Sequence, residues 1–454
     1  MFRSKLTTRR GFLKAAAAAS VAAPYVLTSE ALGAPGRSAA SERITMGFIG
    51  QGGQGSGHLG ISGRGDIQTL AVCDVDATRR YNAMKRVEKM YGQRTASGQY
   101  KGCAAFNNFE DLVARDDIDA VLIATPNHWH GLTSIAAIKG GKDVYCEKPH
   151  SLTIGEGRAV CRAAERYGRV FQTGSQERSG RARLGCELVL NGRIGKVHTI
   201  RTYLPCAGKL PDNYQPEPPS PAYGYPAQKP PPGFDYDLWL GPAPWTPYNP
   251  RRCHFNFRWV LDYSDGELTD RGAHVNDIAM WGNGTESTGP VEIDGRGQFQ
   301  KGIYNVPVRY HIEYKFANGV KMITTSYNGR DDNPDLGGRG IQFEGTDGWL
   351  WIEIHGGALR ASNPDILKSR IRPEEVHLHH SPGHHEDWIR AIRSRGQTVA
   401  HCEAGHRTAS LLHLGLNSMI LGRKIKWDPD KEVSPNDPEA TRMVLRPMRS
   451  PWHI

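Results

Sequence analysis

The sequence predicts an α/β protein in two parts: a doubly wound parallel sheet, followed by an α+β part with a large, mostly antiparallel open sheet. Over residues 43–170, short apolar segments of strand length alternate with helical segments, which is typical of a parallel sheet with helices on both faces. Beyond Val197, apolar and polar residues alternate over longer runs, which is typical of antiparallel strands. A chain of 454 residues is also too long for one ordinary domain.

The predicted elements follow in chain order. In the first part we expect strands at residues 43–49, 67–73, 120–124, 142–146 and 169–173, with helices at 109–115 and 131–139. In the second part we expect strands at 308–316, 321–327 and 348–354, and a helix at 388–392. These elements predict a first domain at 43–170, a second domain at 171–425 and a tail at 426–454 that packs on the body.

Residues 205–250 form a proline-rich arm within the second domain. They hold 14 of the 29 prolines, together with Tyr and Trp residues. A stretch of this kind is rarely a free linker in a compact protein. We therefore expect an ordered arm that packs on a neighbour or rims the functional site.

The first 33 residues carry the pattern of an export signal. Thr8-Arg9-Arg10-Gly11-Phe12-Leu13-Lys14 is a twin-arginine motif, followed by an apolar stretch at 15–27 and small residues at 31–34. A linker at 34–42 then leads into the first domain. The twin-arginine route carries folded proteins, so we expect a periplasmic location. The alternative is a basic, alanine-rich first helix.

Composition excludes several classes of protein. The formal net charge of +10 falls to +6 without the first 33 residues, and no dense Lys/Arg block remains, so we expect no nucleic-acid partner. After the signal, no apolar run reaches the roughly 18 residues that an integral membrane helix needs. The eight cysteines include no Cys-x-x-Cys pair, and their spacing fits no zinc or iron–sulfur motif. We expect mostly buried free thiols.

A glycine-rich turn follows the first predicted strand. Residues 50–55 fit the dinucleotide fingerprint G-x-G-x-x-G, with glycines at Gly50, Gly52, Gly53 and Gly55. Asp74 ends the next strand, where a carboxylate can accept the ribose hydroxyls and repel a 2′-phosphate, which favours NAD over NADP. Arg79 and Arg80 keep NADP open as the less favoured cofactor. The alternative is a glycine turn without a ligand.

Three further motifs make the chain resemble the Gfo/Idh/MocA oxidoreductases, the family of glucose–fructose oxidoreductase and inositol dehydrogenase. They are residues 124–130 (ATPNHWH), 146–149 (CEKP) and 268–277 (LTDRGAHVND). The twin-arginine start and residues 236–242 (YDLWLGP) are typical of its exported branch. The resemblance covers roughly residues 43–425. It implies a Rossmann domain that binds NAD(P), followed by a domain for substrate binding and oligomerisation.

The resemblance implies three catalytic residues. Lys148 matches the lysine that lies beside the nicotinamide and hydrogen-bonds the reacting hydroxyl. Asp270 and His274 are four residues apart, so on a helix they share a face. Imidazole titrates near working pH, which makes His274 the expected general base, with Asp270 positioning the substrate or the imidazole. Alternatively, Lys148 is a surface residue, Asp270 caps the helix and His274 belongs to the core.

The remaining candidate residues divide between cofactor and substrate. The resemblance implies that a loop closing over the cofactor, and residues beside the nicotinamide, contribute Thr125, Pro126, Asn127, His130, Glu147 and Gln176. The resemblance implies that Glu177, next to Gln176, also lies where family members contact the nicotinamide or the sugar. Sugars need bidentate polar contacts and an aromatic platform, which makes Arg258, Trp259 and Tyr263, with Asp262, candidate substrate-binding residues.

A histidine cluster at residues 377–385 could in principle bind zinc. The resemblance brings no metal to this segment, so we expect no metal. His385, at the start of the predicted helix, is the member that we expect to reach the site. We expect His401, His406 and His413 to be structural.

Three functions are compatible with these residues. The main hypothesis is an NAD-dependent oxidoreductase that acts on a secondary hydroxyl of a sugar, glycoside or polyol, with tightly held NAD because free NAD is scarce outside the cytoplasm. The alternative is an NAD-dependent glycosidase or lyase that oxidises, eliminates and re-reduces without net redox change, with His128, His150 or Tyr263 as candidate acid–base groups. The Glu147-Lys148-Pro149 motif favours the dehydrogenase. The third is a non-catalytic binding protein. The resemblance also implies a homodimer or homotetramer.

Overall fold

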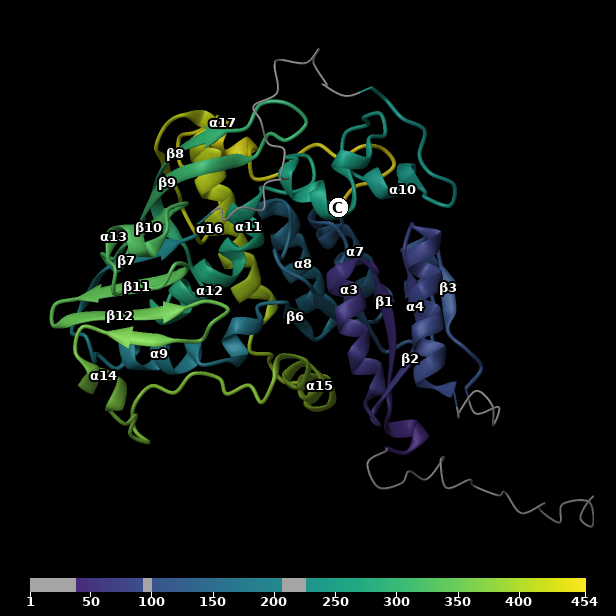
Figure 1. The fold of residues 1–454 in the computed structure, drawn as a ribbon, viewed down its shortest axis with the longest axis horizontal. Coiled ribbons are helices and arrows are strands. Elements are labelled where there is room, and N and C mark those ends of the chain that lie inside the picture. The colour runs from purple at the N-terminus through teal and green to yellow at the C-terminus, as the bar shows by residue number, and fades with distance from the viewer. Residues whose placement is uncertain (1–37, 93–99, 206–225) are drawn as a thin grey trace, which may run out of the picture.

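The computed structural model describes residues 38–92, 100–205 and 226–454. The predicted export signal and residues 206–225, in the first half of the proline-rich arm, lie outside the described residues. The chain forms two sheets, each with its own helices, and α16 (Cys402–Leu421) lies between them (Figure 1). The predicted fold class is confirmed.

The first sheet is a six-stranded parallel sheet with the order β3-β2-β1-β4-β5-β6. This is the strand order of a doubly wound dinucleotide-binding domain. Its elements are β1 (Ile44–Ile49), α3 (Gly53–His58), β2 (Ile67–Cys73), α4 (Ala77–Met90), β3 (Ala104–Phe106), α6 (Phe109–Val113), β4 (Ala120–Ile123), α7 (Asn127–Lys139), β5 (Asp143–Cys146), α8 (Ile154–Tyr167) and β6 (Phe171–Thr173).

The second sheet has eight strands in the order β13-β12-β11-β7-β10-β9-β8-β14 and is antiparallel except for the β7–β10 pair. Its strands are β7 (Val197–Tyr203), β8 (Pro290–Phe299), β9 (Pro307–Phe316), β10 (Lys321–Thr325), β11 (Gly340–Gly345), β12 (Gly348–Glu353), β13 (Leu359–Ala361) and β14 (Ile425–Lys426). Helices α9 (Ala182–Leu190), α12 (Gly272–Gly282) and α16 share its hydrophobic core.

The remaining helices are short or lie at the edges. They are α10 (Tyr236–Leu240), α11 (Glu267–Asp270), α13 (Gly329–Asp332), α14 (Pro364–Lys368), α15 (His384–Ser394) and α17 (Pro438–Arg442). The described part of the proline-rich arm includes α10 and belongs to an aromatic core cluster with residues such as Trp259 and Tyr304. In the segment 426–454, Trp452 packs against Trp129 of the first part, with ring centroids 4.8 Å apart.

Two features of the first core lie beyond the predicted boundary at residue 170. Strand β6 pairs with β5, so the parallel sheet extends past that residue. Helix α15 also packs on this sheet, because Trp388, Ile389 and Ile392 belong to the same cluster as Phe48 of β1. The helix is longer than the expected 388–392 and begins at His384. The first core is therefore built from segments that are far apart in the sequence.

Helices α8 and α16 have well-defined ends. The Thr153 hydroxyl accepts a hydrogen bond from the Glu156 N–H at the start of α8, and Gly168 ends the helix in the left-handed conformation (φ 59°). Gly422 ends α16 in the same way (φ 64°).

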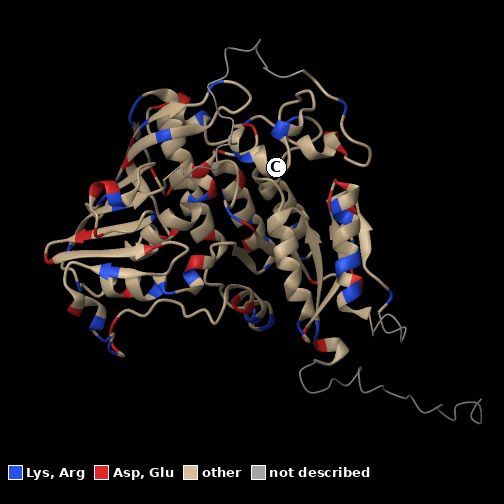
Figure 2. Cartoon of the chain, viewed as in Figure 1, with Lys and Arg blue, Asp and Glu red and all other residues tan. Residues whose placement is uncertain are grey.

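Charged residues of both signs are spread along the chain. Lys and Arg are interspersed with Asp and Glu over both parts in the view shown (Figure 2). Among the described residues, no helix is both long enough and apolar enough to span a bilayer.

Candidate active site

A cavity of about 480 Å³ lies at the carboxyl ends of the parallel strands, where open α/β sheets bind ligands. Both parts of the chain contribute to its lining. The first part supplies the glycine turn, Asp74, Arg79, residues 124–127, Glu147 and Lys148, and the second supplies Phe234, Trp239, His254, Phe255, Phe257, Arg258 and Asp270. Most of the predicted site residues therefore meet in one cavity.

The glycine turn requires glycine at two positions. Gly50 has φ +86°, and a Cβ there would lie 2.6 Å from the carbonyl oxygen of Ala124. A Cβ at Gly55 would lie 1.9 Å from the carbonyl oxygen of Gly50, so the first turn of α3 packs directly on the strand end. Gly52 and Gly53 line the cavity, and a Cβ at Gly53 would meet nothing within 4 Å.

Asp74 lines the cavity at the end of β2. Its carboxylate accepts hydrogen bonds from the N–H groups of Gln51, at 2.6 Å, and Asp76, at 2.8 Å. Burial raises the pKa of Asp74, and these two hydrogen bonds oppose that effect. Arg79 also lines the cavity, whereas Arg80 bonds to the carbonyl oxygen of Asp74 and to Asn107. Only the first of the two arginines borders the ligand space.

Lys148 and Asp270 meet at the boundary between the two parts. The Lys148 ammonium group donates to Asp270 Oδ1, at 2.8 Å, and to its backbone carbonyl oxygen, at 2.9 Å. Arg258 Nε lies 3.2 Å from Asp270 Oδ2. Burial raises the pKa of Asp270, but the charges and hydrogen bonds of Lys148 and Arg258 outweigh this and hold the pKa well below its usual range. Asp270 is therefore an ion-paired carboxylate and not a helix cap.

His274 lies in the first turn of α12, after a break in the helix at Arg271 (φ −96°, ψ −31°). It is buried and does not line the cavity. Burial and the charge of Lys148 lower the pKa of His274 well below its ordinary value, whereas Glu147 and Asp270 raise it. Its Nδ1 has no hydrogen-bond partner among the described residues. The imidazole is neutral at working pH.

Glu147 is the centre of a buried network beneath the cavity. Its Oε1 lies 2.8 Å from His58 Nε2 and accepts from Gln176 Nε2 at 2.7 Å and Gln54 Nε2 at 3.3 Å. Burial raises the pKa of Glu147, but the hydrogen bond with His58 and the charge of Lys148 overcome this and lower it to about 2. Gln176, predicted to contact the cofactor, does not line the cavity. Its amide group donates to Glu147 and to the hydroxyl of Tyr145.

His58 and His385 extend this network. His58 Nδ1 lies 2.8 Å from His385 Nε2, which places His385 in the second layer of the site. Burial and the charge of His58 lower the pKa of His385 to about 4. His58 was not among the predicted site residues, since no spacing motif marks it beyond its place in the helix after the glycine turn.

The other predicted residues divide into those at the cavity and those behind it. Thr125, Pro126 and Asn127 line the cavity, and Asn127 also donates to the Ser264 hydroxyl at 2.9 Å. His130 lies behind them, with its ring nitrogens 2.6 Å from the carbonyl oxygen of Pro149 and 2.9 Å from that of Thr125. It holds the two loops together.

Trp259 and Tyr263 do not reach the cavity. Both are buried in the aromatic cluster beside α10, with exposed fractions of 1% and 0%. The aromatic surface at the cavity comes from Phe234, Trp239, Phe255 and Phe257 instead. His128 is buried against Tyr263, with ring centroids 5.0 Å apart, and burial lowers its pKa to about 4. His150 also lies outside the cavity lining and faces Cys402.

The histidines at 377–385 have separate partners. His377 bonds to the carbonyl oxygen of Arg372, and His379 Nε2 lies 2.6 Å from Asp387. His384 lies between the Ser179 hydroxyl and the carbonyl oxygen of Thr173. The segment therefore fixes α15 to its surroundings.

Two family models match the chain. Residues 44–175 match the NAD-binding Rossmann fold of the Gfo/Idh/MocA oxidoreductases, and residues 223–454 match the C-terminal alpha/beta domain of that family. The chain belongs to the Gfo/Idh/MocA oxidoreductase family. The resemblance inferred from the three motifs is confirmed, and so is an NAD-binding Rossmann domain in an oxidoreductase.

Individual relatives of the family differ in their named activities. A "glycosyl hydrolase family 109 protein" of Shewanella pealeana is 33% identical over 172 residues, which are 35% of this chain and 37% of the relative. A "1,5-anhydro-D-fructose reductase" of Ensifer adhaerens is 37% identical over 95 residues, 21% of this chain and 28% of the relative. The chain thus matches only 37% and 28% of the length of these two relatives.

Solved structures share the fold over nearly their whole length. The WlbA dehydrogenase of Chromobacterium violaceum, in complex with NADH and UDP-GlcNAcA, superposes with a TM-score of 0.58 at 17% identity. The match covers 85% of this chain and 96% of that one.

Proposed function

We propose that this protein oxidises a secondary hydroxyl of a sugar, glycoside or polyol, with transfer of the hydride to tightly bound NAD. The observation that carries the proposal is that one cavity holds both a nucleotide-binding turn and an ion-paired lysine. Gly50, Gly52 and Asp74 line it on one side, and Lys148, Asp270 and Arg258 line it on the other.

The residues present fit NAD. The glycine turn leaves backbone exposed to the cavity, and the buried Thr125 hydroxyl has no hydrogen-bond partner among the described residues. Asp74 would hold the adenosine ribose, and the aromatic side chains of Phe234 and Trp239 would border the nucleotide. When bound, NAD supplies the hydride acceptor.

The chain's own residues bind the substrate hydroxyl and accept its proton. Two of the three ammonium donors of Lys148 go to Asp270, which leaves the third for the substrate hydroxyl. We assign acceptance of that proton to His274, which lies behind the cavity lining but close enough to Lys148, Glu147 and Asp270 to interact with their charges. Its neutral form is favoured, and its Nδ1 lacks a partner among the described residues. Asp270 fixes the lysine, and Arg258 fixes Asp270.

A glycosidase that uses NAD transiently is the second candidate. The family 109 glycosyl hydrolase names among the relatives favour it. His128, His150 and Tyr263 do not line the cavity, so the acid–base groups of such a reaction would have to come from elsewhere in the lining.

The twin-arginine motif supports a proposal of export after folding, with the cofactor already inside. Captive NAD would then be reoxidised in place by a second carbonyl compound. We further propose a homodimer or homotetramer formed through the open sheet of the second part.

The experiment is to purify the protein without added nucleotide, denature it and identify what is released by mass spectrometry. Near-stoichiometric NAD or NADH supports captive cofactor. The purified protein is then offered a panel of sugars, polyols and nitrophenyl glycosides. A change in NADH absorbance with a free sugar supports the dehydrogenase. Release of nitrophenol without net NADH establishes the glycosidase instead. An empty cavity that exchanges NAD freely contradicts the captive cofactor.

A further inference from the structure

A second cavity, of about 430 Å³, lies where α8, β6 and the start of α16 meet. Cys161 of α8 and Cys402 of α16 both line it. The side chain of His150 reaches the same point from the loop after β5. These residues are absent from the catalytic cavity and have no part in the proposed reaction.

The three side chains converge closely. Cys161 Sγ, Cys402 Sγ and a ring nitrogen of His150 all lie within 4.8 Å of one another. Cys402 Sγ and His150 Nε2 are 3.8 Å apart. In a tetrahedral zinc site, with Zn–S near 2.3 Å and Zn–N near 2.0 Å, a sulfur and a nitrogen on one ion lie roughly 3.6 Å apart. The observed separation therefore requires only a small contraction.

The surroundings orient His150 as a ligand would be oriented. Its Nδ1 lies 3.3 Å from the Thr173 hydroxyl, which leaves Nε2 directed at Cys402. Two glycines make room for the ring and its neighbours. A Cβ at Gly157 would lie 2.6 Å from His406 Nδ1 and 3.3 Å from the His150 ring. A Cβ at Gly405 would lie 2.1 Å from the Thr173 hydroxyl and 3.2 Å from His150 Nδ1.

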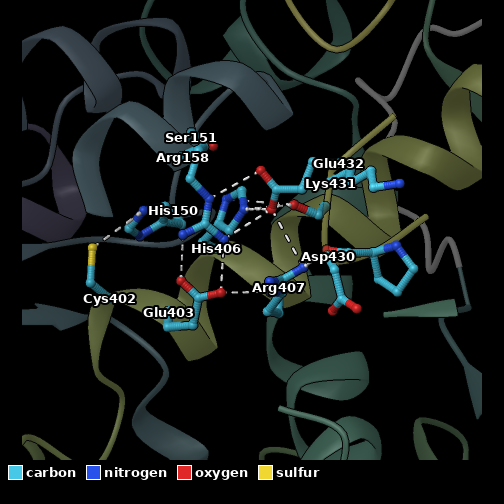
Figure 3. A network of polar contacts seen from close by, with 12 residues as sticks. His150, Ser151, Arg158, Cys402, Glu403, His406, Arg407, Asp430, Lys431 and Glu432 are labelled. Carbon is cyan, nitrogen blue, oxygen red and sulfur yellow. Dashed lines mark hydrogen bonds and ion pairs between the residues drawn. The ribbon is translucent and has the colours of Figure 1, made fainter. Parts of the chain in front are cut away.

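The neighbouring charges are paired, and they brace the same two helices. Figure 3 shows Cys402 and His150 beside Arg158, whose guanidinium group bonds to Glu403 at 2.7 and 2.8 Å and to Glu432 at 2.9 and 3.0 Å. His406 and Arg407 complete this network. Arg158, which lines the second cavity, is therefore neutralised by two carboxylates and would not repel a cation strongly.

We propose that His150, Cys161 and Cys402 bind Zn²⁺, with water from the second cavity as the fourth ligand. Two thiolates and one imidazole are the donor set that zinc and other soft divalent ions prefer. The ion links α8 to α16. It also fixes the loop of Lys148 and Pro149, because His150 directly follows them. The sequence spacing gave no sign of this site, since the ligands come from three separate elements.

The test titrates the reduced, full-length protein with Co²⁺, whose bonds to thiolates give a charge-transfer band in the near ultraviolet. We expect one ion per chain, an intense visible spectrum typical of tetrahedral cobalt, displacement by Zn²⁺, and a rise in Tm with Zn²⁺ concentration. C161S and C402S should each abolish the charge-transfer contribution of one thiolate and weaken binding on the order of a hundredfold. T173V should weaken it roughly tenfold, in the range of lost second-layer contacts.

Cys103→Ser is the matched control, since it makes the same chemical change at a buried cysteine of the first part and keeps all three ligands. It should bind cobalt like the wild type. The wild-type titration stands on its own if a variant fails to fold. Absence of a thiolate band in the reduced wild type overturns the proposal. A second result would also overturn it: C161S and C402S still bind cobalt, whereas His377→Ala or His380→Ala does not. The surface histidines would then be the ligands.

Discussion

Lys148 and Asp270 are 122 residues apart in sequence, yet the lysine ammonium group bonds to both the side chain and the backbone carbonyl of the aspartate. The pair thus connects the loop after β5 to the end of α11 in the lining of the first cavity. Two hydrogen bonds within the chain therefore hold the lysine ammonium group.

Replacing Lys148 by methionine should lower kcat by roughly 10²–10⁴-fold, the range for loss of a group that manages a proton. The nucleotide released on denaturation should stay at the wild-type level, because the glycine turn and Asp74 are untouched. Steady-state kinetics and mass spectrometry of the released nucleotide measure the two effects. A K148M enzyme with wild-type kcat would remove the lysine from the reaction.

The pH dependence of kcat should show no inflection near 6.5 from His274, since burial and the charge of Lys148 keep its imidazole neutral at that pH. His274→Gln should still lower kcat, because glutamine cannot take up the hydroxyl proton. Stopped assays across the range above and below neutrality provide the profile. An inflection near 6.5 that disappears in H274Q would show that the imidazole titrates normally.

Glu147 should make the stability of the protein depend on acid pH. Its pKa is about 2 in the folded chain, against an ordinary value of 4.5. The stabilisation is full above 4.5 and is lost as pH falls from 4.5 through 2, because the unfolded chain takes up the proton first. The difference amounts to about 3 kcal/mol.

Glu147→Gln removes that titration. We expect the unfolding free energies of wild type and E147Q to converge by about this amount between pH 5 and pH 2. Urea unfolding at a series of pH values measures it. Parallel pH profiles for the two proteins would contradict a strongly lowered pKa.

Gly55→Ala and Gly53→Ala form a matched pair in the glycine turn. A Cβ at Gly55 would collide with the carbonyl oxygen of Gly50, so G55A should cost about 3 kcal/mol or more and release the nucleotide. A Cβ at Gly53 meets nothing, so G53A should change stability by about 1 kcal/mol or less. Thermal unfolding and the bound nucleotide content compare them. Equal effects would show that the turn can shift.

Asp74→Asn should shift the cofactor preference toward NADP. The change removes the charge that opposes a 2′-phosphate, while Arg79 remains at the cavity. The ratio of the Kd values for NADP and NAD should fall by roughly tenfold, equivalent to about 1.4 kcal/mol. Fluorescence titration of the nucleotide-free protein with each cofactor gives the ratio. Weaker binding of both cofactors without a change in ratio would mean that Asp74 only orders the turn.

The parts of the fold that depend on local sequence could be predicted. Strand 67–73 matches β2 at both ends, since its apolar run is bounded by turn residues. Gly50, Gly55 and Asp74 follow from one motif; Gly50 and Asp74 line the cavity, and Gly55 packs the helix on the strand end. Lys148 and Asp270 belong to separate motifs. Their direct contact requires only that both lie at the carboxyl ends of the parallel strands.

The parts that depend on packing between distant segments could not be predicted. His58 and His385 are in contact across 327 residues, and neither has a spacing pattern that points to the other. Trp259 and Tyr263 have the chemistry of a sugar platform, but the described part of the proline-rich arm buries them. The proximity of Cys161 and Cys402 could not be predicted either, because the sequence does not show how α8 packs against α16.

Helix α15 determines when the protein can finish folding during synthesis. Trp388 packs against Tyr145 of β5, with ring centroids 5.6 Å apart, and completes the core under the parallel sheet. The ribosome makes β5 long before it makes this helix. The core under the parallel sheet is therefore completed only after α15 has been made, and this ties the folding of the first part to that of the second.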